Sequence, residues 1–209
     1  MLIKICGIKN KSTLICCNNN NVNFFGMIFY KNSPRNIIID EALKLQEDSK
    51  NLSIKGVGVF VDENIENLKN IIRILNLKFV QLHGNENNEY INEFKSLNVK
   101  IIKKISIKEK SDLKEIDNFI NVDYFLFDYK PGVNELPGGN AKKFDWEIIK
   151  NLNMEKPWFL SGGINIDNIF EIKSKIKPYG IDLSSSLEKK LGIKDNDIIN
   201  NFMVKFNDA

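Results

Sequence analysis

Short apolar segments recur at fairly even spacing along the chain, and most of them are continuous rather than alternating. Continuous runs of β-branched and aromatic residues are typical of strands covered on both faces, as in a parallel sheet. The segments with this pattern are 2–5, 24–29, 54–60, 79–82, 99–105, 124–127, 158–160 and 180–183. The pattern therefore predicts eight strands.

Amphipathic stretches lie between these segments. In the stretch 65–75, apolar residues at helical spacing fall on one face: Ile65, Leu68, Ile71, Ile72 and Leu75. Tyr90, Ile91, Phe94 and Leu97 repeat the pattern, as do Leu113, Ile116 and Ile120. Further helices are expected around 37–45, 145–152, 167–176 and 195–206, several with an Asp or Asn near the start that suits an N-cap.

Strands that alternate with helices indicate βα units and a parallel sheet. Eight such units without a linker in mid-chain favour a closed (β/α)8 TIM barrel, formed by residues 1–209 as a single domain. An open doubly wound sheet is the structural alternative. At 209 residues the barrel is near the minimum size for this fold, so its loops must be short.

Composition narrows the classes of protein that fit. The chain is 43% apolar and carries a net charge of only +3, which does not indicate binding to nucleic acid or to a membrane surface. It contains no apolar stretch of about 18 residues and no signal-peptide pattern near the start. Its three cysteines argue against a secreted disulfide framework. We expect a cytoplasmic protein that is a monomer or a weak homodimer.

Candidate chemistry gathers where the predicted strands end. In a barrel of this type the active site lies at the carboxyl ends of the strands. The polar or glycine residues that fall there are Cys6, Ser33, Arg35, His83, Asp128, Ser161, Gly162, Gly163, Asp182, Ser184, Ser185 and Ser186. Their convergence on one mouth carries more weight than any one of them.

The last two strand ends suit a phosphate. Gly162 and Gly163 leave backbone N–H groups uncovered, and Ser184–Ser186 precede a stretch able to begin a short helix. Barrels often bind phosphate with the loops after strands 7 and 8 and such a helix. The simpler alternatives are a tight turn and a helix cap.

Cys6 and Asp128 are candidates for acid–base chemistry. A buried free cysteine is usually a small apolar residue, and only its thiolate is reactive. Asp128 follows four apolar residues, where desolvation favours a protonated carboxyl. A thiol and a carboxyl facing each other across the mouth suit a proton transfer in which one group donates and the other removes.

The remaining candidates have plainer alternatives. Arg35 is one of two arginines in a chain that otherwise uses lysine, which suggests planar contact with a carboxylate or phosphate, although a surface arginine is possible. His83 is the only histidine and is a site residue or a structural one. Cys16 and Cys17 are interpreted as structural, because no spacing fits a zinc site and no metal is expected.

Several motifs together resemble the phosphoribosylanthranilate isomerase family. They are the segments 4–8 (Lys-Ile-Cys-Gly-Ile), 25–35, 58–61, 80–84 (Val-Gln-Leu-His-Gly), 138–146, 160–165 and 180–195, in the order of the family and across nearly the whole chain. The resemblance implies a cofactor-independent Amadori rearrangement in tryptophan biosynthesis, in which an aldose amine becomes a ketose amine.

The resemblance also implies roles for residues. Cys6 matches the general base and Asp128 the general acid, while Arg35 is expected to face the carboxylate of the anthranilate. Gln81, His83 and Asp182 are expected to contact the rest of the substrate. The phosphate is expected on Gly162, Gly163, Ser184, Ser185 and Ser186.

The chain departs from the family at a few positions. The family usually has Gly-Gly-Thr-Gly after strand 6, where this chain has Gly138-Gly139-Asn140-Ala141, and Ser186 replaces a usual glycine. The stretch 12–23 is rich in Asn and Cys where the family is rich in Ala and Gly. Two rival functions remain open: a sister sugar-phosphate isomerase of histidine biosynthesis, and a non-catalytic barrel that binds a metabolite.

Overall fold

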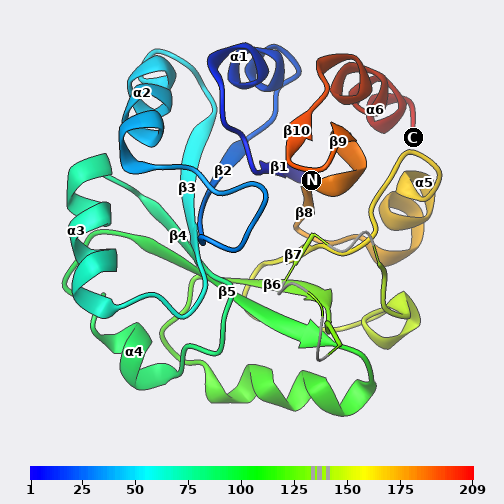
Figure 1. Cartoon of the computed structure of the whole chain (residues 1–209). Coiled ribbons are helices and arrows are strands. Elements are labelled where there is room, and N and C mark those ends of the chain that lie inside the picture. The colour runs from blue at the N-terminus through cyan, green and yellow to red at the C-terminus, as the bar shows by residue number, and fades with distance from the viewer. Residues whose placement is uncertain (133–134, 136–137, 140–141) are drawn as a thin grey trace.

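The computed structural model describes residues 1–132, 135, 138–139 and 142–209, and its strands form a closed parallel barrel. Each strand pairs with the next in chain order, and β8 pairs with β1 to close the ring (Figure 1). The strands are β1 (Leu2–Cys6), β2 (Phe24–Phe29), β3 (Lys55–Phe60), β4 (Phe79–Leu82), β5 (Lys100–Ile107), β6 (Tyr124–Tyr129), β7 (Trp158–Leu160) and β8 (Gly180–Leu183). The barrel is closed, so the open-sheet alternative is wrong.

Helices surround the barrel in a ring, and α6 completes it beside α1 (Figure 1). The α-helices are α1 (Lys11–Asn19), α2 (Ile39–Ser49), α3 (Ile65–Leu75), α4 (Asn88–Asn92), α5 (Ile169–Glu171) and α6 (Asn196–Asp208). The 3₁₀-helices are η1 (Lys110–Asn118), η2 (Trp146–Ile148) and η4 (Ser185–Leu187), and the π-helix η3 (Ile172–Ile176) continues α5.

Local sequence explains where several helices begin. The side chains of Asn10, Asn64, Asn87 and Asp195 accept hydrogen bonds from backbone N–H groups in the first turns of α1, α3, α4 and α6. This satisfies N–H groups that have no partner within a helix. Of the stretches where the sequence predicted an Asp or Asn cap, α6 has the cap Asp195 and η2 has the cap Asp145, whereas α2 and α5 have no side-chain cap.

The core has two parts. The larger part lies between the barrel wall and the helices, and it includes Leu14 and Cys17 from the Asn- and Cys-rich helix α1. The smaller part fills the barrel and contains Phe24, Val57, Val59, Ile102, Leu126 and Phe159. Because side chains alternate along a strand, polar residues two positions from these apolar ones also point inward.

Some predicted helices are shorter or differently wound than expected. The stretch 145–152 holds only the three-residue η2, and 110–118 winds as a 3₁₀-helix rather than an α-helix. Ile120, expected on the apolar face of that helix, lies beyond its end and is 75% exposed. Lys, Asp and Asn dominate η1, so few apolar side chains hold it against the barrel.

After η4 the chain forms a hairpin that the apolar pattern did not predict. Its strands are β9 (Glu188–Lys190) and β10 (Ile193–Lys194), joined through Gly192 at φ +79°. An added Cβ on Gly192 would meet the backbone of Pro34, so the hairpin packs closely on the loop after β2.

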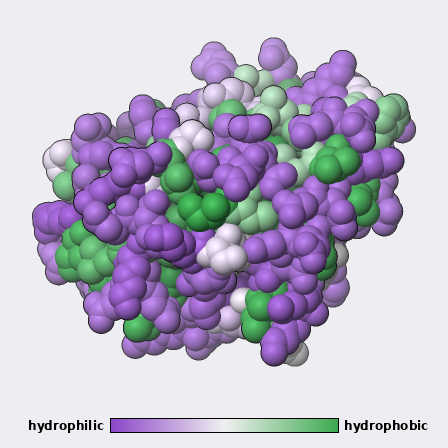
Figure 2. All heavy atoms as spheres, turned by 90° about the horizontal axis from the view of Figure 1, so that it is seen from above, coloured by the Kyte–Doolittle hydropathy of each residue, from purple (hydrophilic) through white to green (hydrophobic). Residues whose placement is uncertain are grey.

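The surface seen in Figure 2 is mainly hydrophilic, with apolar residues in separate small patches. Within the described residues, no helix is both long and apolar enough to cross a membrane.

Candidate active site

Two adjoining pockets lie at the carboxyl ends of the strands. One contains Cys6, Arg35, Gln81 and His83, and the other contains Gly162, Gly163 and the three serines after β8. Asp128, Asp182 and Ser184 line both pockets, so the two form a continuous mouth. Every candidate site residue predicted from the sequence therefore lies in this mouth.

β1 and β8 carry a buried ion pair. Lys4 and Asp182 are register partners on these strands, and Lys4 Nζ lies 3.0 and 2.9 Å from the two carboxylate oxygens of Asp182. Burial opposes the charge on Lys4, but the carboxylate of Asp182 raises the pKa of Lys4 above its ordinary value. Burial also raises the pKa of Asp182, although Lys4 opposes that effect.

Cys6 lies two residues after Lys4, on the same face of β1. An added Cβ on Gly26 of β2 would lie 2.7 Å from Cys6 Sγ and 3.2 Å from Lys4 Nζ, so the thiol and the ammonium meet over this glycine. Burial raises the pKa of the Cys6 thiol, while the positive charges of Lys4 and Lys194 lower it. The thiol is therefore the resting form at neutral pH, and a nearby cation is in place to stabilise the thiolate.

On the opposite side of the mouth, Asp128 faces His83. Asp128 Oδ2 lies 3.5 Å from His83 Nε2, and Asp128 Oδ1 accepts a 2.8 Å hydrogen bond from the N–H of Tyr129. Gln81 Nε2 lies 2.9 Å from His83 Nδ1. When the Gln81 amide donates, the tautomer that carries its proton on Nε2 points that N–H toward Asp128.

Burial keeps His83 neutral. It lowers the pKa of His83, and the carboxylate of Asp128 opposes that shift only in part. A neutral His83 at the edge of the mouth can orient the Asp128 carboxyl without placing a full positive charge beside it.

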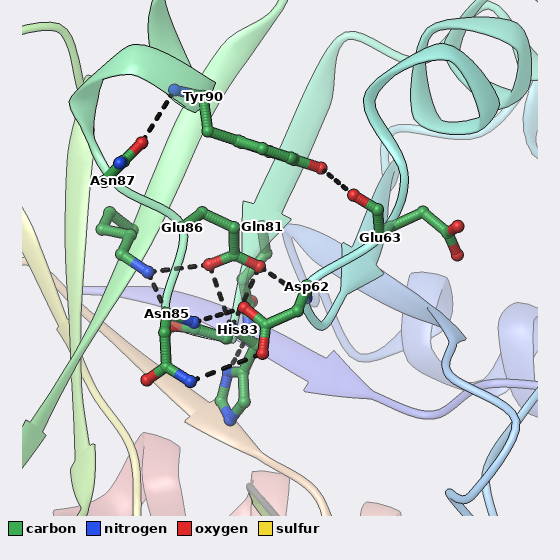
Figure 3. Close-up of polar contacts among 10 residues, drawn as sticks. Asp62, Glu63, Gln81, His83, Asn85, Glu86, Asn87 and Tyr90 are labelled. Atoms are coloured by element: carbon green, nitrogen blue, oxygen red, sulfur yellow. Dashed lines mark hydrogen bonds and ion pairs between the residues drawn. The ribbon is translucent and has the colours of Figure 1, made fainter.

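A buried carboxylate fixes the turn that carries His83. Both carboxylate oxygens of Glu86 accept 3.1 Å hydrogen bonds from the N–H of Gly84. Glu86 also forms a 2.8 Å ion pair with Lys103 and accepts a hydrogen bond from the N–H of Asp62. Figure 3 shows Glu86 between Asp62 and this turn. The position of His83 is therefore set by buried polar contacts of the loop that follows β4.

Glycines shape the phosphate end of the mouth. Gly162 and Gly163 have φ values of +83° and +68°, which favour glycine. An added Cβ on Gly162 would lie 2.9 Å from Asp128 Oδ1. Ser186, in contrast, is not among the residues with positive φ, so its side chain causes no backbone strain. The expected extra helix after β8 is the single turn η4.

Arg35 is buried and already paired with a residue of the hairpin. Its Nε and Nη2 donate to the carboxylate of Glu188 at 2.7 and 2.9 Å, and Lys194 Nζ contacts the same carboxylate at 2.6 Å. Burial opposes the charge on Glu188, but the hydrogen bonds from Arg35 and the charge of Lys194 lower its pKa. Burial lowers the pKa of Lys194 despite that carboxylate.

Gly138 and Gly139 lie directly on the mouth. An added Cβ on Gly138 would lie 2.6 Å from His83 Nε2, and one on Gly139, at φ +75°, would collide with Arg35 Nη1. The departures from the family at Asn140 and Ala141 lie outside the described residues.

Residue-type reasoning gave no role to four charged residues whose side chains are buried next to the site: Lys4, Lys104, Glu188 and Lys194. Lys4 shares a strand face with Cys6, two positions away, so the period of the strand could have found it. Lys104 lies in β5 at 7% exposure, and burial lowers the pKa of its amine.

Within the described residues, no three His, Cys, Asp or Glu side chains gather as a metal site would require.

A closed βα barrel with this polar mouth at its carboxyl end defines the class, a small (β/α)8-barrel enzyme. The pattern of the N-(5'phosphoribosyl)anthranilate (PRA) isomerase family matches residues 3–205. The chain belongs to this family of isomerases, which act in tryptophan biosynthesis.

Individual relatives agree with this membership. The N-(5'-phosphoribosyl)anthranilate isomerase of Agrobacterium fabrum is 38% identical over 209 residues, which cover 99% of this chain and 94% of that protein. The crystal structure of phosphoribosyl anthranilate isomerase from Thermotoga maritima is 28% identical, covers 100% of both chains and superposes with a TM-score of 0.89.

A further solved structure, with 26% identity, full coverage of both chains and a TM-score of 0.85, is that of an isomerase in complex with reduced 1-(o-carboxyphenylamino)-1-deoxyribulose 5-phosphate. The rival interpretation as a non-catalytic barrel does not fit membership in a family of isomerases.

Proposed function

We propose that the mouth converts N-(5-phosphoribosyl)anthranilate into 1-(2-carboxyphenylamino)-1-deoxyribulose 5-phosphate. The observation that carries this proposal is that all eleven residues to which the family resemblance gives a role line two adjoining pockets. The mouth offers groups that bind an anion at each end: glycines and serines line one end and Arg35 the other. A family member bound to the reduced product supports the same substrate class.

The phosphate binds between β7 and β8. Gly162 and Gly163 offer N–H groups without a covering side chain, and Ser184, Ser185 and Ser186 add hydroxyl and N–H donors. Because phosphate is recognised by several convergent donors, this end anchors the substrate. The reacting carbons then lie over the centre of the barrel.

The carboxylate of the anthranilate binds Arg35 at the other end. The guanidinium lines the pocket that also contains Cys6 and His83. A planar cation at this position recognises a carboxylate and orients the aromatic ring.

Asp128 starts the reaction as the general acid. It gives a proton to the furanose ring oxygen, the bond from C1 to that oxygen breaks, and the nitrogen lone pair forms a Schiff base with C1. His83 and the N–H of Tyr129 hold the Asp128 carboxyl in place. General acid catalysis of this type contributes about 10²–10⁴-fold to a rate.

Cys6 completes the reaction as the general base. Its thiolate removes the proton from C2, the electron pair moves to form an enolamine, and tautomerisation gives the ketone at C2. C2 is oxidised and C1 is reduced within one molecule, so the electrons balance without a co-reactant. Lys4 stabilises the thiolate, and Asp182 orients a hydroxyl of the sugar.

Turnover of freshly prepared phosphoribosylanthranilate tests this function, followed by the loss of its fluorescence. The wild-type protein should turn the substrate over, and Cys6→Ser and Asp128→Asn should each be slower by about 10²–10⁴-fold. Cys16→Ser and Asp117→Asn are the matched controls, and they should retain normal rates. A folded wild-type protein without turnover would contradict the function.

A further inference from the structure

Glu188 lies at the start of β9 with its side chain only 3% exposed, and all its acceptor positions are in use. Oε1 accepts from Arg35 Nε at 2.7 Å and from Lys194 Nζ at 2.6 Å. Oε2 accepts from Arg35 Nη2 at 2.9 Å and from the N–H of Gly192 at 3.0 Å. A carboxylate with four donors has no capacity left for a substrate, so it acts on its neighbours.

Arg35 is left with one edge that faces the mouth. A guanidinium is planar and rigid, so two fixed nitrogens determine the direction of the third. Nη1 makes no hydrogen bond or ion pair within the described part of the chain, and it lies against Gly139 in the pocket lining. The Arg35 side chain also packs on Gly7, where an added Cβ would lie 3.0 Å from Arg35 Cδ.

Lys194 balances the charge of this group. Arg35 and Lys194 supply two positive charges and Glu188 one negative charge, which leaves one buried positive charge beside the mouth. Lys194 Nζ also contacts the carbonyl oxygen of Ser184 at 3.1 Å. The group therefore joins the Arg35 end of the mouth to the loop after β8, and it favours an anionic ligand.

We infer that Glu188 is a positioning residue that holds Arg35 Nη1 toward the carboxylate of the substrate and so sets the specificity for a carboxylated aromatic amine. This inference rests on the proposed function, because Arg35 must be the carboxylate contact. Glu188 itself touches no substrate atom. Its contribution to recognition of the substrate carboxylate passes through the Arg35 guanidinium.

Binding of two ligands to Glu188→Gln tests the inference. The first ligand is reduced 1-(o-carboxyphenylamino)-1-deoxyribulose 5-phosphate, and the second is the phenylamino analogue without the carboxylate. The variant should bind the first ligand about tenfold or more weakly than the wild type does, and the second within about twofold. In turnover, KM should rise while kcat changes little.

A double-mutant cycle separates positioning from a structural role. In an Arg35→Met background, the further change Glu188→Gln should cause no additional loss of affinity for the first ligand, because the guanidinium that Glu188 positions is already absent. The inference would be overturned if Glu188→Gln reduced affinity for the first ligand equally in both backgrounds, or if it reduced affinity for both ligands equally.

A charge-matched variant and the wild-type protein are the two controls of this test. Glu188→Gln leaves two buried cations without a counter-charge, so Glu188→Gln/Lys194→Met, which restores the wild-type net charge of the group, is measured beside it. This charge-matched variant should show the same selective loss of the first ligand, and an unchanged affinity ratio in a folded variant would contradict the inference. A wild-type protein that binds neither ligand would contradict the proposed function instead.

Discussion

The reactivity of Cys6 depends on where its side chain lies. The thiol is buried at the mouth, where desolvation disfavours the thiolate and Lys4 and Lys194 partly compensate. The same residue type behaves differently in the outer core, where burial raises the pKa of Cys17 to about 12 without a role in the mouth. Lys194 lowers the pKa of both thiols, so it is the contact with Lys4 that distinguishes the candidate base from a structural cysteine.

The pH dependence of Cys6 follows from this position. A raised pKa means that the thiolate is scarce near neutral pH and increases as the pH rises past about 8.5, the value of a free thiol. Alkylation of Cys6 by iodoacetamide, quantified by mass spectrometry, should reach half of its maximal rate at a higher pH than a cysteine peptide. A midpoint at or below that of the peptide would show that the thiolate is already favoured.

Gly139 is sensitive to substitution because Arg35 lies against it. A Cβ at this position would collide with Arg35 Nη1, and φ +75° is strained for alanine. Gly139→Ala should raise KM by about tenfold, since charge-assisted contacts are worth about 1.5–3 kcal/mol. Gly132→Ala is the control, because an added Cβ there meets no atom closer than 3.8 Å. Similar KM values for the two variants would show that the guanidinium adjusts freely.

The candidate site could be predicted from the sequence only as far as residue types at strand ends allow. Cys6, Asp128 and His83 follow apolar strands, and that signal found them. Glu188 and Lys194 lie in a hairpin without a distinct apolar pattern, so the sequence did not show that Glu188 contacts Arg35, which is distant in the sequence. Tertiary packing alone brings Arg35 and Glu188 together.

Several helices begin at a single capping side chain. Asn64 caps α3, and its Oδ1 accepts from the N–H groups of Glu66 and Asn67 at 3.0 and 3.2 Å. Asn64→Ala should lower the free energy of unfolding by about 1 kcal/mol. Asn70→Ala, within the same helix, should cause no loss, because alanine is the better helix former there. Urea unfolding measures both variants, and equal stabilities would contradict the capping role.

Elements with strong periodicity were predictable, and those held by tertiary contacts were not. The apolar face of 65–75 became α3 with the expected bounds. The stretch 145–152 forms only the short helix η2, and this single turn already buries Trp146 and Ile149. Burial of a few residues is thus compatible with several backbone conformations, which periodicity alone does not distinguish.

The whole barrel closes where β1 meets β8, and a buried ion pair crosses this seam. Lys4 and Asp182 are register partners there, with side chains 0% and 6% exposed. Lys4→Met should lower the free energy of unfolding by about 3–5 kcal/mol, because it leaves a buried carboxylate without a partner. Lys100→Met, which breaks an exposed ion pair with Asp123, should cause no measurable change. Equal losses in urea unfolding would contradict this role of burial.

The division of labour between Cys6 and Asp128 is tested most directly by a kinetic isotope effect with substrate deuterated at C2. When proton removal by Cys6 is slowed in Cys6→Ser, that step limits the rate, and the isotope effect on kcat/KM should be larger than in the wild type. When ring opening is slowed in Asp128→Asn, the isotope effect should fall toward one. The opposite order, or equal isotope effects in both variants, would contradict the assignment of base and acid.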